Sequence, residues 1–177
     1  MDAPPDPSTP PETRQRVAAL YEAHALGLVK LAKIMLGDQS QAEDIVHDAF
    51  LGLYRKWPAL DDKDRALGYL RTSVLNGCRT AYRGRTRRDR ALRYFHRADD
   101  IVSAEESAMI GEANRAVMAA LRALPSRQRE AVVLRYYLDL SEAQAAEAMN
   151  VARGTVKSAT SRGLAAMARM LKEGEVR

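Results

Sequence analysis

The stretch "SEAQAAEAMNVARGTVKSATSR", residues 141–162, holds two short helical patterns separated by a break at Asn150. Ser141 and Gln144 have the spacing of a capping box, which predicts that a helix begins there. Asn150 is the residue type that, after glycine, best tolerates the positive φ of a tight turn. A second helix is expected over residues 154–171. Two short helices joined by a tight turn form a helix-turn-helix.

Three residues of this stretch meet the packing needs of that motif. Ala146 is small enough to let the second helix cross the first, and Val156 is a β-branched residue that can lock the second helix from below. The offsets of four and six residues between Ala146, Asn150 and Val156 match the motif. Because Ala-rich helical hairpins imitate this pattern, the spacing alone leaves both interpretations open.

The second helix carries polar side chains along its N-terminal half, above an apolar stripe. They are Arg153, Thr155, Lys157, Ser158, Ser161 and Arg162. In a helix-turn-helix this half enters the major groove, where Lys and Arg donate to guanine and Ser or Thr bond bases or phosphates. The alternative is a merely solvated face. Such a face more often mixes charges, and this one holds no acid before Glu173, which favours DNA binding.

The composition of the 177 residues excludes several functional classes. Apolar residues make up 46% and aromatic residues 6%, which permits real cores and favours helices over sheets. One cysteine and three scattered histidines predict no metal site, and the absence of a phosphate loop or nucleophile motif predicts no cofactor, no small-molecule substrate and no enzyme. Without an apolar run for a membrane span or a signal peptide, we expect a cytoplasmic protein. The net charge of +5 favours an anionic partner.

Three further helices are predicted in the first half of the chain. The first covers residues 14–36 and ends at Gly37, a residue type that suits the left-handed position after a helix. Ser40 and Glu43 have the spacing of a capping box for the second helix. The third begins near Arg65 and continues into an arginine-rich stretch.

The second and third helices each have a polar face opposite their apolar residues. On the second helix this face comprises Glu43, Asp44, His47 and Asp48, and on the third it comprises Asn76, Arg79, Thr80 and Arg83. A solvated face is the alternative for the second helix. Asn76, Gly77 and Thr80 are poor helix formers, which indicates either that the third face has a function or that tertiary packing favours these residues.

The region before the helix-turn-helix has its own helical signals. Pro125 separates two short helices, and Ser126 is expected to cap the second of them. Apolar spacing predicts a buried side that comprises Val132, Val133, Tyr136 and Tyr137. Gly163 lies inside the last helix and is expected to weaken it by about 1 kcal/mol.

We therefore predict an all-α protein with two small helical domains joined by a flexible linker. The boundaries are a Pro-rich disordered tail (1–13), a first domain (14–83), a linker that changes from basic to acidic (84–114), a second domain (115–172) and a short tail (173–177).

Three segments resemble the short extracytoplasmic-function (ECF) class of bacterial sigma factors. "QAEDIVHDAFLGLYRKW" (41–57) is similar to the helix that binds the polymerase clamp, and "GYLRTSVLNGCRTAYRGRTRR" (68–88) resembles the −10 helix. Residues 121–167, which begin "LRALPSRQREAVVLRYY" and contain "GTVKS", resemble the domain that binds the −35 element. The resemblance implies that residues 14–83 are sigma region 2 and residues 115–172 are sigma region 4.

The resemblance also implies partners and residue roles. The protein would bind the β′ clamp and the β subunit of core RNA polymerase, direct the enzyme to promoter DNA, and be held by an anti-sigma factor, as such proteins usually are. The acidic face of the second helix would dock on the β′ clamp, and the polar face of the third would meet the −10 element. A loop of Asp61, Asp62, Lys63 and Asp64 would help capture one flipped base. Arg135 would join the polar residues of the last helix at the −35 element.

Two other functions compete with this one. A helix-turn-helix regulator could bind operators as a homodimer without polymerase, but no heptad run provides a dimer seam. A purely protein-binding helical adaptor would leave the arginine cluster of residues 79–97 and the face around Lys157 unexplained.

Overall fold

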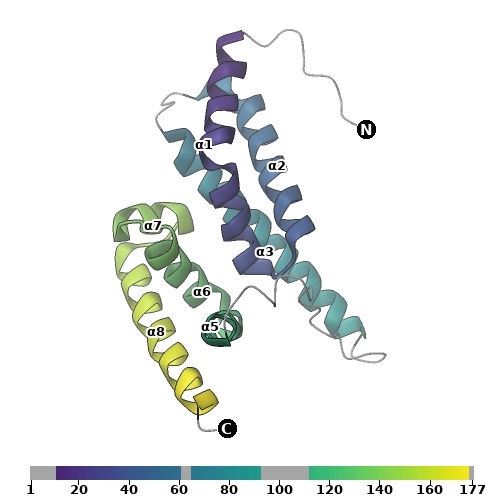
Figure 1. Ribbon diagram of the computed structural model, residues 1–177. Helices are drawn as coiled ribbons and strands as arrows, with labels where there is room; N and C mark the ends of the chain where they lie inside the picture. Colours follow the sequence, from purple (N-terminus) through teal and green to yellow (C-terminus); the bar gives the residue numbers. More distant parts are fainter. Residues whose placement is uncertain (1–10, 61–64, 93–111, 176–177) are drawn as a thin grey trace.

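All regular elements in the described part of the chain are helical, as predicted. The structure is a computed structural model that describes residues 11–60, 65–92 and 112–175. Its elements are α1 (Pro11–Leu36), α2 (Gln39–Lys56), η1 (Trp57–Ala59), α3 (Ala66–Leu92), α5 (Glu112–Ala123), α6 (Ser126–Val132), η3 (Val133–Tyr137), α7 (Glu142–Met149) and α8 (Arg153–Glu175). Figure 1 shows them as two groups, α1 to α3 and α5 to α8, so the all-α fold with two domains is confirmed.

Several predicted segments lie wholly or partly outside these residues. The residues outside the described ranges are the predicted loop of Asp61 to Asp64, residues 1–10 of the tail, residues 93–111 of the linker and the last two residues. Helix α1 begins at Pro11, inside the segment assigned to the tail, and a proline is well suited to the first turn of a helix. Helix α3 continues to Leu92, past the predicted domain boundary at Arg83.

The first domain packs α1, α2 and α3 around a core of aliphatic side chains that includes Leu31, Leu53 and Leu70, all 0% exposed. Gly37 ends α1 with a φ of +78°, the left-handed conformation that its residue type predicts. The predicted capping box at Ser40 is wrong. Asp38 caps α2 instead, and its carboxylate accepts a hydrogen bond from the Gln41 N–H at 2.9 Å. Asp38 is the N-cap because aspartate caps a helix as well as serine does and because Asp38 directly follows the turn at Gly37.

The second domain packs α5, α6 and α7 against the long helix α8. Pro125, not the Ser126 side chain, stands at the N-cap of α6, so the predicted serine cap is wrong. Val132 and Val133 are buried as predicted, but Tyr136 and Tyr137 are 66% and 45% exposed. The physical reason is the π turn η3, in which the Leu138 N–H donates to the Val133 carbonyl five residues back. This wider turn shifts the helical register and moves both tyrosines away from the core.

Two glycines lie where helices approach each other closely. A Cβ on Gly77 of α3 would stand 2.6 Å from Ile45 Cγ2 of α2. A Cβ on Gly163 of α8 would stand 2.8 Å from Val132 Cγ2 and 3.4 Å from the Gln128 carbonyl oxygen of α6. Tertiary packing therefore explains Gly77, one of the two alternatives that its sequence left open. It also offsets the local penalty expected for Gly163, because the missing side chain lets α6 and α8 pack together.

We predict that Gly77→Ala lowers the free energy of unfolding by about 1 kcal/mol. Overpacking against Ile45 costs about 1–3 kcal/mol, and the better helix propensity of alanine offsets up to about 1 kcal/mol of it. Gly84→Ala is the matched control in the same helix, because no atom lies within 4 Å of its Cβ position. It should raise stability by up to about 1 kcal/mol. Urea unfolding of both variants measures the difference, and an equal gain for both would contradict the close approach of α2 and α3.

Candidate nucleic-acid interface

Helices α7 and α8 form a helix-turn-helix around the turn at Asn150. Ser141 and Gln144 form the predicted capping box, with the Gln144 N–H donating to Ser141 Oγ at 3.2 Å and the Ser141 N–H donating to Gln144 Oε1 at 2.9 Å. Asn150 adopts φ 53° and ψ 54°, the left-handed conformation. The Val151 N–H then donates to the Ala146 carbonyl at 3.0 Å, which closes the turn.

The packing at this turn also agrees with the sequence. Ala146 is 6% exposed and Val156 is fully buried, as the crossing of the two helices requires. Helix α8 begins at Arg153, and the Thr155 N–H donates to the Ala152 carbonyl at 2.9 Å. Ala152 has no side-chain oxygen with which to cap α8, so the start of this helix depends on the turn that precedes it.

The polar residues of the leading half of α8 lie on an accessible surface. Thr155 is half-buried, and the exposed residues are Arg153, Lys157, Ser158, Ser161 and Arg162. The Arg162 Nε donates to the Ser158 carbonyl at 3.2 Å, and Ser158 Oγ donates to the Thr155 carbonyl at 3.1 Å. Both hydrogen bonds are local and lie on an exposed surface. Because the Arg162 guanidinium is a donor, an acceptor on DNA could take the place of the Ser158 carbonyl.

Arg135 lies apart from this row, in η3 rather than on α8. Its guanidinium donates to the Leu140 carbonyl within the same domain, and the residue is half-buried. This bond holds Arg135 against the segment that leads into α7. A contact between Arg135 and DNA would therefore exchange this carbonyl for a DNA acceptor.

The acidic face of α2 is exposed as predicted. Glu43, Asp44, His47 and Asp48 all lie at the surface, while Val46, Ala49 and Phe50 of the same helix are buried. The Gln39 side-chain amide donates to the Glu43 carboxylate, which holds that carboxylate at the N-terminal end of the face. The face thus presents negative charge on a helix whose opposite side is buried.

The polar face of α3 is only partly accessible. Asn76, Thr80 and Arg83 are exposed, but Arg79 is engaged by the second domain. Arg79 Nε donates to Glu130 Oε1 at 2.9 Å, and Nη2 donates to Glu130 Oε2 at 2.6 Å. Nη2 also donates to the Met149 carbonyl at 3.2 Å, and Nη1 donates to Asn76 Oδ1 at 2.9 Å. The hydrogen bonds to Glu130 raise the pKa of Arg79 above its usual value, so the guanidinium stays protonated.

A second arginine at this junction is buried. Arg129 of α6 is 5% exposed, and its Nη1 donates to the Met35 carbonyl of α1 at 2.8 Å. Its Nη2 donates to the Leu124 carbonyl at 3.0 Å, and the guanidinium carbon lies 5.7 Å from the ring centroid of Tyr82 of α3. Burial lowers the pKa of Arg129, because the low-dielectric surroundings disfavour its charge.

Sequence reasoning missed Arg129 and Glu130. A signal was available, since the two residues lie one helical turn before Val132 and Val133 and therefore share the apolar side of α6. Charged residues on such a stripe are buried only when they are paired. The identity of the partners, in α1 and α3, could not be read from this pattern.

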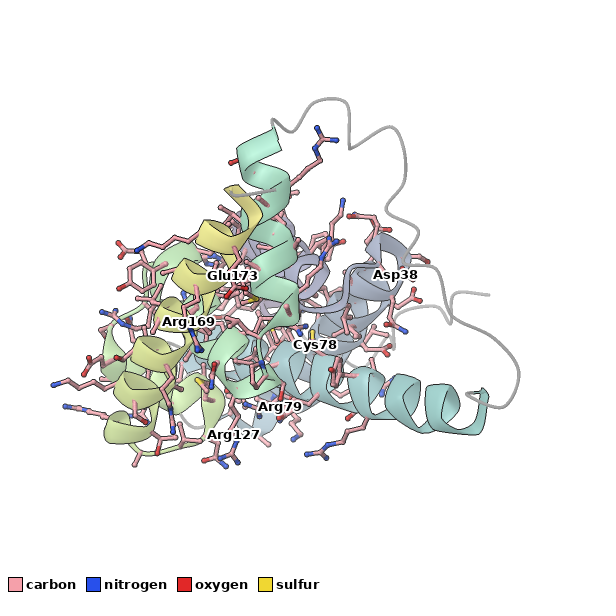
Figure 2. All side chains as sticks on the ribbon, turned by 90° about the horizontal axis from the view of Figure 1, so that it is seen from below. Asp38, Cys78, Arg79, Arg127, Arg169 and Glu173 are labelled. Atoms are coloured by element: carbon pink, nitrogen blue, oxygen red, sulfur yellow. The ribbon has the colours of Figure 1, made fainter. Side chains whose placement is uncertain are left out.

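A cavity of about 310 Å³ lies at the junction, lined by α3 on one side and by α6 and the α7–α8 turn on the other. Figure 2 views the junction from below and labels Cys78, Arg79 and Arg127, which all line this cavity. Burial, together with the negative charge of Glu130, raises the pKa of Cys78 to about 12. The only thiol of the chain is therefore protonated and unreactive at neutral pH. Among the described residues no cluster of His, Cys, Asp and Glu could hold a metal ion, and no helix has the length and apolarity of a membrane span.

Comparison with known families finds two matches, one in each of the two helical domains. Residues 20–88 match the family described as Sigma-70 region 2, and residues 114–167 match Sigma-70, region 4. The ECF RNA polymerase sigma factor SigM of Mycobacterium tuberculosis is 32% identical over 152 residues, which cover 86% of this chain and 75% of SigM. The RNA polymerase sigma-E factor of Streptomyces coelicolor is 30% identical over 139 residues, which cover 78% of this chain and 76% of that protein.

A solved structure supports the same fold. The sigma factor RpoE from Bartonella quintana, solved with the anti-sigma factor NepR, aligns with a TM-score of 0.68 at 24% identity, over 91% of this chain and 97% of RpoE. The two region matches, the identity to SigM and the helix-turn-helix geometry agree. The chain therefore belongs to the sigma-70 family of RNA polymerase sigma factors, in the ECF group.

Proposed function

We propose that three separate surfaces of this chain carry out its function. As a sigma factor it directs RNA polymerase to specific promoters for transcription initiation, and it is not itself an enzyme. The surfaces are the acidic face of α2 for polymerase, the polar face of α3 for the −10 element, and the leading half of α8 for the −35 element. The observation that supports this proposal best is the exposure of Arg153, Lys157 and Arg162 on the leading half of α8, which follows the turn at Asn150.

The −35 surface would work by direct contact in the major groove. Arg162 and Lys157 can donate to guanine N7 and O6, and Thr155, Ser158 and Ser161 can bond base edges or phosphates. Arg153 stands at the start of the helix, where its charge can reach the DNA backbone. Arg135 would approach the same element from η3 once it leaves the Leu140 carbonyl.

The −10 surface would hold one unpaired strand. Asn76 offers both a donor and an acceptor to an unstacked base, and Thr80 and Arg83 lie on the same side of α3 for phosphates. Arg79 would join them after exchanging Glu130 for a phosphate. The loop of Asp61, Asp62, Lys63 and Asp64 would help to receive a flipped base. Extruding a base costs a few kcal/mol, so contacts of this kind must offset that cost.

The polymerase surface would be the negative face of α2. Glu43, Asp44, His47 and Asp48 would dock on a basic part of the β′ clamp, while the second domain contacts the β subunit. The buried side of α2 holds this helix in place, so little backbone order has to be gained on binding.

Two further features follow from this proposal. The protein would work in the cytoplasm, where RNA polymerase is found. It would also have an anti-sigma partner, by analogy with RpoE, solved with NepR, and with CnrH, solved with the cytosolic domain of CnrY. CnrH aligns with a TM-score of 0.68 at 21% identity, which supports the fold and leaves the partner a proposal.

Reversal of charge at Asp44 and Asp48 tests the polymerase surface. Asp44→Lys with Asp48→Lys should weaken binding to core polymerase at least tenfold while the circular dichroism spectrum stays helical. Glu12→Lys with Glu22→Lys is the matched control, because it makes the same change in charge at exposed positions of α1. Fluorescence anisotropy of labelled protein titrated with core polymerase measures the affinities. Wild-type affinity for the Asp44 and Asp48 variant would place the docking face elsewhere.

Asn76→Ala tests the −10 surface. We expect promoter opening, followed with 2-aminopurine in the −10 element, to fall about tenfold while the affinity for core polymerase stays within twofold. Asn76 accepts a hydrogen bond from Arg79, so the melting temperature must be measured as well. A lower melting temperature with normal opening by the surviving protein would assign Asn76 a structural role only.

Alanine substitutions on the second domain test the −35 surface. Arg162→Ala and Arg135→Ala should lower transcription from the preferred −35 sequence, and at least one should relax the choice at a single base, by about 1–3 kcal/mol. Lys157→Ala either does the same or weakens all sequences alike and reduces the salt slope by about one. Arg169→Ala, an exposed arginine two turns beyond Arg162, is the control. Transcription from single-base −35 variants at fixed salt measures the effects.

The three possible patterns of that panel differ in meaning. Loss at one base position identifies a reading contact. Uniform loss for every variant would mean that the surface only holds DNA. Unchanged transcription for all three variants would remove the −35 assignment of this face.

A further inference from the structure

A groove lies between α2 and α3, and its lining residues come from these two helices alone. Helices α2 and α3 lie side by side in the first domain (Figure 1). The volume of the groove is about 180 Å³. Pockets that hold a small molecule are about 300–1,000 Å³, so this groove has room for one side chain of a partner rather than for a metabolite.

Two close contacts give the register of the helices along the groove. At one end the Cβ position of Gly77 of α3 lies 2.6 Å from Ile45 Cγ2 of α2. At the other end the Cβ position of Gly52 of α2 lies 3.3 Å from Tyr69 Oη of α3. From the first end to the second, residue numbers rise along α2 and fall along α3, so the two helices run antiparallel. A glycine at each end keeps the space between the helices open.

The middle of the groove carries two polar side chains, Asp48 of α2 and Ser73 of α3. Each lies about one helical turn from both ends, so the two face the same part of the groove. Asp48 is exposed and Ser73 is half-buried. Within the part of the chain that the structure describes, neither side chain makes a hydrogen bond or an ion pair. A carboxylate accepts hydrogen bonds and a hydroxyl can accept one too, so the middle of the groove suits a donor.

The charges around the groove favour a cationic donor. Of the described residues that line it, Asp48 alone is charged. Glu43 and Asp44 are exposed on the preceding turn of α2 and extend the negative surface. Lys56 lies over the Tyr69 ring, with its Nζ 5.3 Å from the ring centroid. Repulsion from Lys56 disfavours a cation at the Tyr69 end, so the position beside Asp48 is the favourable one.

We propose that this groove receives one cationic side chain, a lysine or an arginine, of core RNA polymerase. Its charged group binds Asp48 and Ser73, and its aliphatic stem lies against the apolar wall at Ile45. The proposal rests on the assignment of the α2 face to polymerase made above, and it adds a shaped site to a charged face. A charge pair in a groove is screened less than a pair on an open surface, so Asp48 contributes more to binding than Asp44 does.

A double-mutant cycle with Gly52→Ala and Asp48→Asn is the test. The added methyl group reduces the space in the groove, and the asparagine removes the charge while keeping the shape of the side chain. Gly27→Ala of α1 is the control for the first change, because no atom lies within 4 Å of its Cβ position. Asp44→Asn is the control for the second, because Asp44 does not line the groove. Fluorescence anisotropy of the labelled full chain, titrated with core polymerase, measures each affinity.

We expect Gly52→Ala and Asp48→Asn each to weaken binding about tenfold. The double variant should bind about as weakly as either single variant, because both changes remove the same contact. In the Asp44→Asn background, Gly52→Ala should still weaken binding about tenfold, because Asp44 takes no part in that contact. Gly27→Ala should leave the affinity unchanged.

Three results would overturn the proposal. Wild-type affinity of Gly52→Ala would show that the groove is empty in the complex, and wild-type affinity of Asp48→Asn would show that its carboxylate binds no cation. Effects of the two changes that multiply in the double variant would show that they act on different contacts. If Asp48→Asn weakens binding and Gly52→Ala does not, the groove is wrong and the polymerase surface on α2 stands. If the wild type does not bind core polymerase, the sigma function itself fails.

A second variant covers the case in which Gly52→Ala displaces Tyr69 or does not fold. Ser73→Leu fills the groove from α3 and leaves α2 unchanged. It should weaken binding at least about tenfold in the wild-type background and much less in the Asp48→Asn background, while circular dichroism shows the helical content of the wild type. Wild-type affinity of a folded Ser73→Leu variant would overturn the proposal.

Discussion

The left-handed turn at Asn150 is the constraint on which the DNA-binding part of the structure depends. A non-glycine residue in this conformation is strained, by roughly 1–2 kcal/mol for most types and less for asparagine, so the surroundings must hold it there. Ala146 and Val156 do so, because a small residue lets α8 cross α7 and a buried β-branched residue fills the space beneath. The direction of α8, and the exposure of Lys157 and Arg162, follow from this turn.

Features that depend on neighbours in the chain could be predicted from the sequence. The capping box at Ser141, the end of α1 at Gly37, the helix-turn-helix and the exposed face of α2 all follow from residue types at fixed spacing. Features that depend on competition or on distant partners could not. Asp38 displaced Ser40 as a cap because two good caps lay two residues apart, and one π turn was enough to expose Tyr136 and Tyr137. The partners of Gly163 and Arg79 lie on other helices, which periodicity along one helix does not identify.

The junction between the domains is built on charged groups that the sequence places on different helices. Arg79 of α3 donates two hydrogen bonds to Glu130 of α6, and Arg129 of α6 donates to the Met35 carbonyl of α1. A buried ion pair contributes little net stability, because desolvation of the charges offsets most of their attraction, yet the loss of one partner is costly. Loss of either Arg79 or Glu130 would therefore cost more than the pair itself contributes.

The most direct test of the central claim is a selection of promoter sequences by the reconstituted holoenzyme. Core polymerase, with and without this chain, transcribes a library of random upstream DNA, and the DNA that yields transcripts is sequenced. The account predicts that two short sequence blocks at a constant separation are enriched when core polymerase and the chain are both present, and that neither component alone enriches them. Equal enrichment of the same DNA by the chain without polymerase would contradict the account and support a polymerase-independent regulator.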